Sequence, residues 1–184
     1  MPLMPDSHSD RDHAEFSPSA LKYIAGCAGF HGRTGTNTAA EKGTRIHEAL
    51  EVGDTSNLES EEEISIYQQI VEEEETFLKN YAQKGRSQIA DHKEIQLTVE
   101  LDGTSTWGTC DRLTIFDDQT AVKADYKSGI SMIDPPESNW QAQAYTVGAF
   151  QKFPELKEIT FVFYIPVRNE TLFHTFARED VPAL

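Results

Sequence analysis

Hydrophobic residues recur at helical spacing in the first half of the chain. In residues 38–52 and 58–83, apolar side chains lie three and four positions apart beneath polar ones, which predicts two amphipathic helices. A shorter helix is expected over residues 18–25. Ser17 can cap it, the proline that follows suits a first helical position, and Gly26 would end it.

Beyond Gly85 the period changes to that of strands. Polar and apolar residues alternate through residues 94–101, and Asp102-Gly103 favours a turn after them. The remaining expected elements are strands at residues 106–116, 121–127, 158–167 and 171–178 and a helix that is capped by Ser138 and continues to about Phe150. Three helices, three strands, one helix and two strands favour an α/β (α+β) fold in which helices flank a mixed sheet.

The length of the chain suits one domain. Its 184 residues include 38% hydrophobic ones, which is enough to bury a core. Residues 1–15 are polar and lack a period, so we interpret them as a disordered N-terminal arm. Residues 16–184 are predicted to form the single domain.

An acid and a lysine lie two residues apart in the expected strand at 121–127. Asp125 and Lys127 would point to the same side of the sheet, and Tyr126 to the other side. A carboxylate can bind a divalent cation, and an ammonium group beside it can orient a water molecule, as metal-assisted hydrolysis of a phosphate ester requires. An ordinary ion pair at a strand end is the alternative.

Three other groups carry similar side chains. His47 and Glu51 are four residues apart on one helix and share a face. Asp111 lies in the strand at 106–116, next to the strand of Asp125. Gln141 and Tyr145 share a face of the next helix.

These groups follow one another as G-x-x-x-H-x-x-x-E, G-x-x-D, D-x-K-S and Q-x-x-x-Y, beginning at Gly43, Gly108, Asp125 and Gln141. This order resembles the RecB-type and phage-type exonuclease branch of the PD-(D/E)XK nuclease superfamily. The resemblance extends over about residues 17–178. Each motif is weak alone, and the four in order are specific.

The resemblance implies a restriction-endonuclease-like core and a metal-dependent DNA nuclease. Mg²⁺ or Mn²⁺ would be bound by His47, Asp111, Asp125 and the backbone carbonyl of Tyr126. Asp111, Asp125 and Lys127 would be the catalytic residues, with Lys127 orienting or deprotonating the attacking water. Carboxylate oxygens and an imidazole nitrogen are suitable ligands for these ions.

Four residues have less defined expected roles. Gln141 and Tyr145 would hold the DNA strand or the lysine. Glu94 matches an acid found in some members of the superfamily, and this match implies a supporting role or a second metal ion. Glu51 is a weaker metal-ligand candidate, and we expect it to face solvent.

The charge of the chain argues against an ordinary nucleic-acid binder. Acidic residues number 31 against 16 basic ones, a net charge of −15, whereas DNA-binding surfaces are usually basic. Much of the excess falls in residues 59–63 and 72–75, which we expect to form a solvated helix face. Two rivals follow: a catalytically idle nuclease fold that binds or inhibits another molecule, and an acidic interaction module with no nucleic-acid role.

A nuclease with this charge needs local basic groups. We expect a positive rim around the metal pocket, formed by Lys42, Arg45, Arg112, Lys123 and Lys127. DNA, single- or double-stranded, would be bound weakly by this rim. Tight action would require a homo-oligomer or a recombination or DNA-binding protein as partner.

The cysteines and the termini bear on cofactors and location. Cys27 and Cys110 are distant in sequence, so neither a disulfide scaffold nor an iron–sulfur cluster is expected. Residues 1–15 contain no signal-peptide core, and no apolar run could span a bilayer. We expect a protein of the cytoplasm of a bacterial or phage-infected cell, acting in recombination, repair or phage DNA processing.

Overall fold

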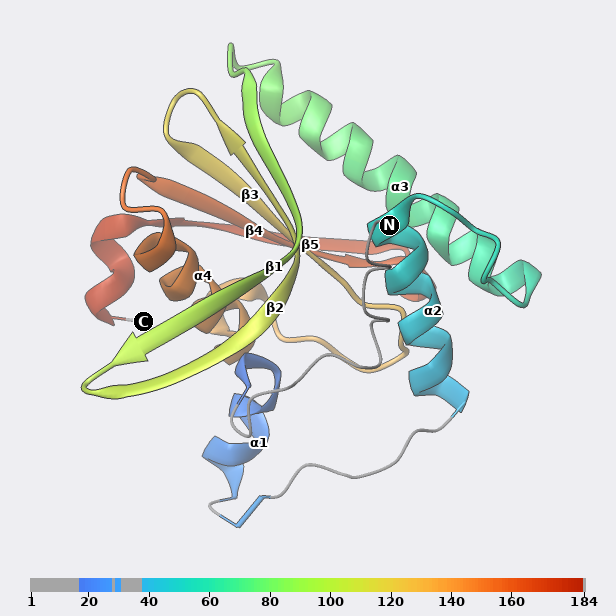
Figure 1. Ribbon diagram of the computed structural model, residues 1–184, viewed down its shortest axis with the longest axis horizontal. Coiled ribbons are helices and arrows are strands. Elements are labelled where there is room, and N and C mark those ends of the chain that lie inside the picture. The colour runs from blue at the N-terminus through green and yellow to red at the C-terminus, as the bar shows by residue number, and fades with distance from the viewer. Residues whose placement is uncertain (1–16, 28, 31–37, 184) are drawn as a thin grey trace, which may run out of the picture.

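A five-stranded mixed sheet forms the centre of the computed structural model, which describes residues 17–27, 29–30 and 38–183. The strands are β1 (Gln88–Leu101), β2 (Thr104–Phe116), β3 (Thr120–Tyr126), β4 (Glu158–Ile165) and β5 (Glu170–Ala177), and they lie in this order across the sheet. Only the β3–β4 pair is parallel. The expected mixed sheet flanked by helices is therefore confirmed (Figure 1).

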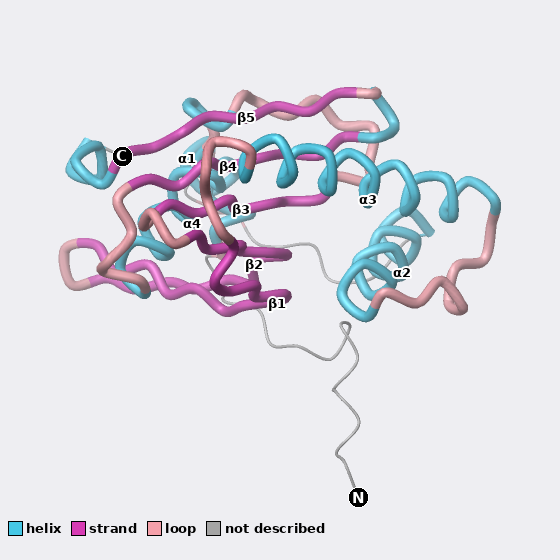
Figure 2. Tube along the Cα trace, turned by 90° about the horizontal axis from the view of Figure 1, so that it is seen from above, coloured by secondary structure: helices cyan, strands magenta, loops and turns pink. Residues whose placement is uncertain are grey.

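Helices cover both faces of this sheet. They are α1 (Leu21–Gly26), α2 (Thr38–Val52), α3 (Glu61–Ala82) and α4 (Trp140–Lys152), with short 3₁₀ segments at Pro18–Ala20, Pro136–Ser138, Pro166–Arg168 and Arg178–Ala183. Helices α2 and α3 lie on one side and α4 on the other (Figures 1 and 2). Helix α4 also provides the long crossover that the parallel β3–β4 pair requires. The predicted arm at 1–15 lies outside the described residues.

Each face of the sheet has its own hydrophobic core. Leu113, Phe161 and Phe163 pack on the α4 side, whereas Val122 and Tyr164 pack on the α2–α3 side. All seven residues of β3 are buried, because helices cover both of its faces. Strand β3 thus places Asp125, and Lys127 directly after the strand, at the centre of the molecule.

The structure corrects three expected boundaries. Asn139 caps α4, in place of Ser138, because its side-chain oxygen accepts hydrogen bonds from the backbone N–H groups of the second and third helical residues. Strand β1 begins at Gln88, six residues before the expected alternation. Ser17 makes no capping hydrogen bond, and the chain after it begins as a 3₁₀ turn.

The glutamate-rich helix α3 is only partly the solvated face that we expected. Glu63 and Glu74 are buried. Glu63 Oε1 lies 2.5 Å from Arg45 Nη2, and Glu74 Oε2 lies 2.5 Å from Arg112 Nη1. A buried carboxylate is tolerated when it is paired, so the expectation was wrong for the two glutamates that meet arginines of α2 and β2.

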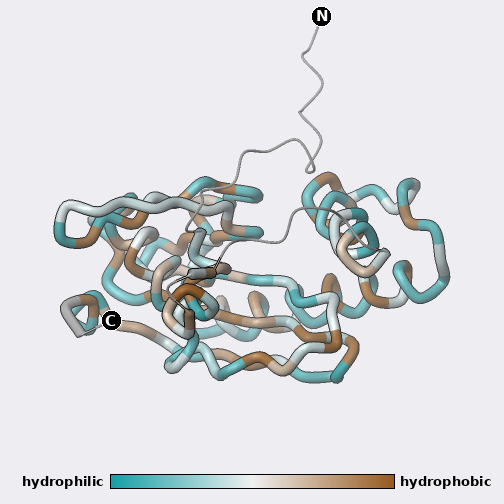
Figure 3. Tube along the Cα trace, turned by 90° about the horizontal axis from the view of Figure 1, so that it is seen from below, coloured by the Kyte–Doolittle hydropathy of each residue, from teal (hydrophilic) through white to brown (hydrophobic). Residues whose placement is uncertain are grey.

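Hydrophilic and hydrophobic stretches alternate along the helices (Figure 3). Within the described residues, no helix is both long and apolar enough to cross a membrane.

Helix α4 lies so close to β1 that residue 148 has to be glycine. A Cβ atom added there would lie 2.9 Å from the carbonyl oxygen of Thr98 and 3.1 Å from Val99 Cγ2. We predict that Gly148→Ala lowers the free energy of unfolding by about 1–3 kcal/mol through overpacking, as measured by urea denaturation.

Gly26→Ala is the matched control, because a Cβ atom at Gly26 has no heavy atom within 4 Å. Equal stability of the two variants would contradict the close approach of α4 to β1.

Candidate active site

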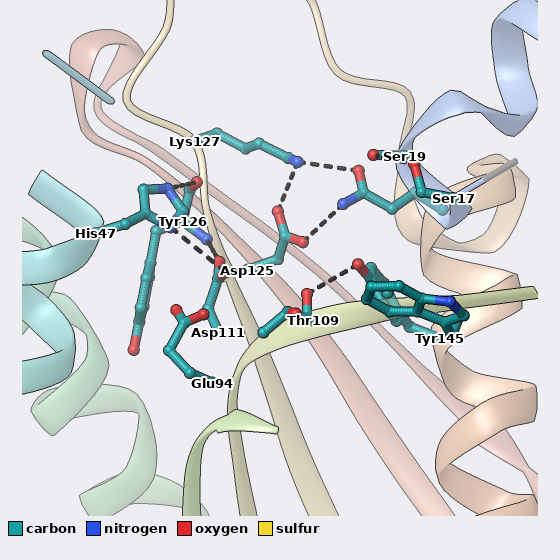
Figure 4. A pocket seen from close by; sticks show the side chains of 13 residues that line it. Ser17, Ser19, His47, Glu94, Thr109, Asp111, Asp125, Tyr126, Lys127 and Tyr145 are labelled. Carbon is teal, nitrogen blue, oxygen red and sulfur yellow. Dashed lines mark hydrogen bonds and ion pairs between the residues drawn. The ribbon is translucent and has the colours of Figure 1, made fainter. Parts of the chain in front are cut away.

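The predicted site residues line one pocket at the carboxyl end of β3. The cavity has a volume of about 230 Å³. The residues that line it include His47, Glu94, Asp111, Asp125, Tyr126, Lys127, Gln141 and Tyr145. They come from α2, β1, β2, β3, α4 and the residue after β3, so the pocket joins elements that are far apart in sequence (Figure 4).

Strand geometry places the acid and the lysine together. Asp125 Oδ2 lies 2.7 Å from Lys127 Nζ. The Tyr126 side chain points to the other face, where its hydroxyl donates to Glu74 Oε1 at 2.9 Å. The alternation of side chains in β3 therefore places the polar pocket on one face of the sheet and the buried Tyr126–Glu74 hydrogen bond on the other.

His47 reaches the pocket from α2 and contacts two groups there. Its Nε2 atom lies 3.0 Å from the carbonyl oxygen of Tyr126, and its Nδ1 atom lies 3.4 Å from Asp111 Oδ1. Asp111 Oδ2 accepts a hydrogen bond from the backbone N–H of Tyr126 at 2.7 Å. A histidine, a carboxylate and a backbone carbonyl thus face one another (Figure 4).

Glu94 belongs to the same group. The ligand atoms of His47, Glu94 and Asp111 all lie within 4.8 Å of one another, an arrangement that could hold a metal ion. Glu94 has φ +49°, a left-handed conformation that is uncommon for a residue with a side chain and that costs on the order of 1–3 kcal/mol.

The sequence contained a signal that places Glu94 beside Asp111. Lys93 pairs with Arg112, and Ile95 with Cys110, so Glu94 lies opposite Asp111 in the hairpin. This register follows from counting outward from the Asp102-Gly103 turn, which the sequence does reveal.

Gln141 connects the acid and the lysine. Its Oε1 atom accepts from Lys127 Nζ at 2.9 Å, and its Nε2 atom donates to Asp125 Oδ1 at 3.0 Å. The Tyr145 hydroxyl donates to the carbonyl oxygen of Thr109 at 2.8 Å. Both side chains hold the pocket wall in the structure.

Glu51 is the one predicted site residue outside the residues described as lining the pocket. Its backbone carbonyl accepts a hydrogen bond from Lys93 Nζ at 3.0 Å, at the end of α2.

The positive rim that we expected is wrong, because most of its cations have acidic partners or are buried. Lys42 Nζ lies 2.7 Å from Glu62 Oε1, and Arg45 and Arg112 pair with Glu63 and Glu74. The remaining two residues of the rim contact Asp125, and one of them, Lys123, is fully buried. Acidic residues of α3 account for three of the five cations, and Asp125 of β3 accounts for the other two.

The carboxylates change the protonation of His47. Burial disfavours the charged imidazole, but Asp111, Asp125 and Glu94 outweigh this effect and raise the pKa of His47 to about 9. Burial would raise the pKa of Asp111, but His47, Lys123 and the N–H of Tyr126 hold that pKa well below its usual range. A metal ion would therefore compete with a proton for His47.

Comparison with known proteins gives a match to a solved structure and none to a protein family. No protein-family model matches the chain, and no curated protein matches its sequence. The crystal structure of a "putative exonuclease" from Eubacterium rectale aligns with a TM-score of 0.51 and 13% identity, over 100% of this chain and 81% of that one. The chain therefore has the fold of that structure.

A second solved structure, that of SSO0001, aligns with a TM-score of 0.35 and 9% identity, over 96% of this chain and 80% of that one. This similarity is too low to support an argument.

The raised pKa of His47 predicts a pH dependence of stability without metal. Between the unfolded pKa near 6.5 and the folded pKa near 9, the folded protein keeps a proton that the unfolded chain has released. The contribution of His47 is complete below pH 6.5 and is lost as the pH rises through 9. It amounts to at most about 3 kcal/mol.

Urea denaturation in EDTA at several pH values checks this prediction. The difference in unfolding free energy between the wild type and His47→Gln should decrease from pH 6.5 to 9. A difference that stays constant or grows would contradict the assignment.

Proposed function

We propose that this protein is a metal-dependent DNA nuclease that hydrolyses phosphodiester bonds, and that it acts as an exonuclease. The observation that carries the proposal is the convergence of Asp111, Asp125, Lys127 and His47 on one pocket. The motif order resembles the RecB-type branch of the PD-(D/E)XK nucleases. The shared fold with the Eubacterium rectale structure supports the same class.

The donor groups of the pocket fit a divalent cation. Asp125 Oδ2 is buried and, among the described residues, has only the Lys127 ion pair and no aligned hydrogen bond. Together with His47, Asp111 and the carbonyl oxygen of Tyr126, it would hold Mg²⁺ or Mn²⁺. The bound ion would supply a Lewis acid for the phosphate oxygen and would acidify a water molecule. Glu94 would add a further carboxylate.

The protein side chains would perform the other steps. Lys127, held by Gln141 and Asp125, would orient the attacking water and offset negative charge on the phosphate in the transition state. Gln141 would fix the distance between this ammonium group and the acid. Tyr145 would keep the wall of the pocket in place through its bond to Thr109.

The charge of the surface limits how DNA would be held. The paired basic residues leave little counterion release to drive binding, so affinity should depend on metal and only weakly on salt. We infer that tight action on DNA needs a homo-oligomer or a DNA-binding partner in recombination, repair or phage DNA processing. We also infer a reducing cytoplasm as the location, and we expect no iron–sulfur cluster.

A catalytically idle fold remains the second candidate function. The net charge of −15 favours it, because an acidic surface can imitate DNA for a basic partner protein. Cleavage assays separate the two candidates, since an idle fold would bind a partner without hydrolysing DNA.

We predict that Asp125→Asn and Lys127→Ala each lower cleavage by at least about 100-fold, because one removes a metal ligand and the other the group that orients water. End-labelled single- and double-stranded DNA is incubated with Mg²⁺, Mn²⁺ or EDTA, and the products are resolved on a gel. The fold of each variant is checked by circular dichroism.

Asp102→Asn, at an exposed turn, and Lys157→Ala, on the surface, are the matched controls and should cleave like the wild type. Near-normal cleavage by either site variant would reject the catalytic assignment. A folded wild type that cleaves no DNA with either metal would favour the idle fold.

A further inference from the structure

A lysine is buried directly behind the pocket. Lys123 precedes Asp125 by two residues on β3, so both side chains lie on the same face, and the Lys123 side chain is 1% exposed. Its Nζ atom lies 3.0 Å from Asp125 Oδ1. It also lies 4.6 Å from the ring centroid of Tyr145 and 4.4 Å from that of Phe161. A fully buried ammonium is rare and costly unless it is paired, whereas an apolar residue would fill this position at no such cost.

The contacts of Lys123 divide the two oxygens of Asp125 between different tasks. Oδ1 accepts hydrogen bonds from Lys123 and from Gln141, each at 3.0 Å. Oδ2 faces Lys127 without an aligned hydrogen bond among the described residues. Two donors thus fix Oδ1, whereas Oδ2 is buried and has the Lys127 ion pair.

The positive charge of Lys123 reduces the repulsion between acidic residues of the pocket. Glu94, Asp111 and Asp125 line one small pocket, where their like charges repel one another. Lys123 places a positive charge behind the residues that line the pocket. The ammonium of Lys127, by contrast, lies on the pocket side, where the side chain is 23% exposed.

We propose that Lys123 is a positioning residue for the metal site, which fixes Asp125 so that only Oδ2 is offered to the cation and which weakens cation binding through its own charge. This inference rests on the proposed metal site. A lower affinity for the cation would let the ion and the product leave after each catalytic cycle. Removing the lysine should have two effects. Loss of its positioning contact should slow turnover, and loss of its positive charge should raise the affinity for the cation.

Lys123→Met has a similar volume without the charge. We expect it to bind Mn²⁺ about tenfold more tightly, since one positive charge close to the carboxylates is lost, and to cleave DNA at least tenfold more slowly at saturating metal. Lys123→Gln also lacks the charge but keeps a donor for Asp125 Oδ1. It should show the same gain in affinity with a smaller loss of turnover, and it serves as the second variant if the first does not fold.

Mn²⁺ affinity is measured by calorimetry without DNA, and turnover is measured with labelled DNA across a range of Mn²⁺ concentrations. Lys93→Met is the matched control. Its ammonium binds the backbone carbonyls of Leu50 and Glu51, so its loss should leave the affinity unchanged. A merely structural lysine would instead give weaker or unaltered Mn²⁺ binding in both Lys123 variants, and this result would overturn the inference.

The calorimetry also separates this inference from the proposed function. If the wild type cleaves no DNA but the Lys123 variants bind Mn²⁺ more tightly than it does, the nuclease proposal fails and the inference about the metal site is supported. Active wild-type protein with no gain in affinity in these variants would overturn the inference alone. A wild type without saturable Mn²⁺ binding would overturn both.

Discussion

Repulsion between carboxylates is the constraint on which the pocket depends. Glu94, Asp111 and Asp125 come from three neighbouring strands and line one small cavity. In an interior of low dielectric, such a cluster is stabilised when cations or donors face its acids. His47 faces Asp111, and Lys123 and Lys127 face Asp125. The proposed metal ion would add a positive charge that further reduces the repulsion between these carboxylates.

Support for the pocket comes from the opposite face of the sheet. Tyr126 presents its carbonyl oxygen to His47 and its N–H to Asp111, while its hydroxyl is held by Glu74 of α3. Glu74 in turn pairs with Arg112, which also binds Asp91. Through this chain of contacts, the buried Glu74 of α3 fixes the backbone of β3 at the point where it faces the candidate ligands.

The sequence predicted the fold and the main pocket residues for different reasons. The periods of 3.6 and 2 reveal which elements form, and the order of four short motifs brings His47, Asp111, Asp125 and Gln141 to one place. Neither signal shows which side chains of different elements form ion pairs with one another. The sequence therefore left the burial of Glu63 and Glu74 unforeseen, since arginines on α2 and β2 decide it.

Lys123 illustrates the same limit. In the sequence it is an ordinary lysine of a strand, and we placed it on a positive rim. Only the packing of Tyr145 and Phe161 against it shows that it lies inside the protein. Glu94 differs, because the hairpin register places it opposite Asp111.

Anomalous scattering from crystals soaked in Mn²⁺ tests whether the pocket binds a metal ion. We expect one Mn²⁺ peak in the pocket, with Asp111, Asp125 Oδ2 and the carbonyl oxygen of Tyr126 within about 2.0–2.3 Å and Asp125 Oδ1 still bound by Lys123. Saturating Mn²⁺ that gave no peak there, or a peak away from both aspartates, would contradict this expectation.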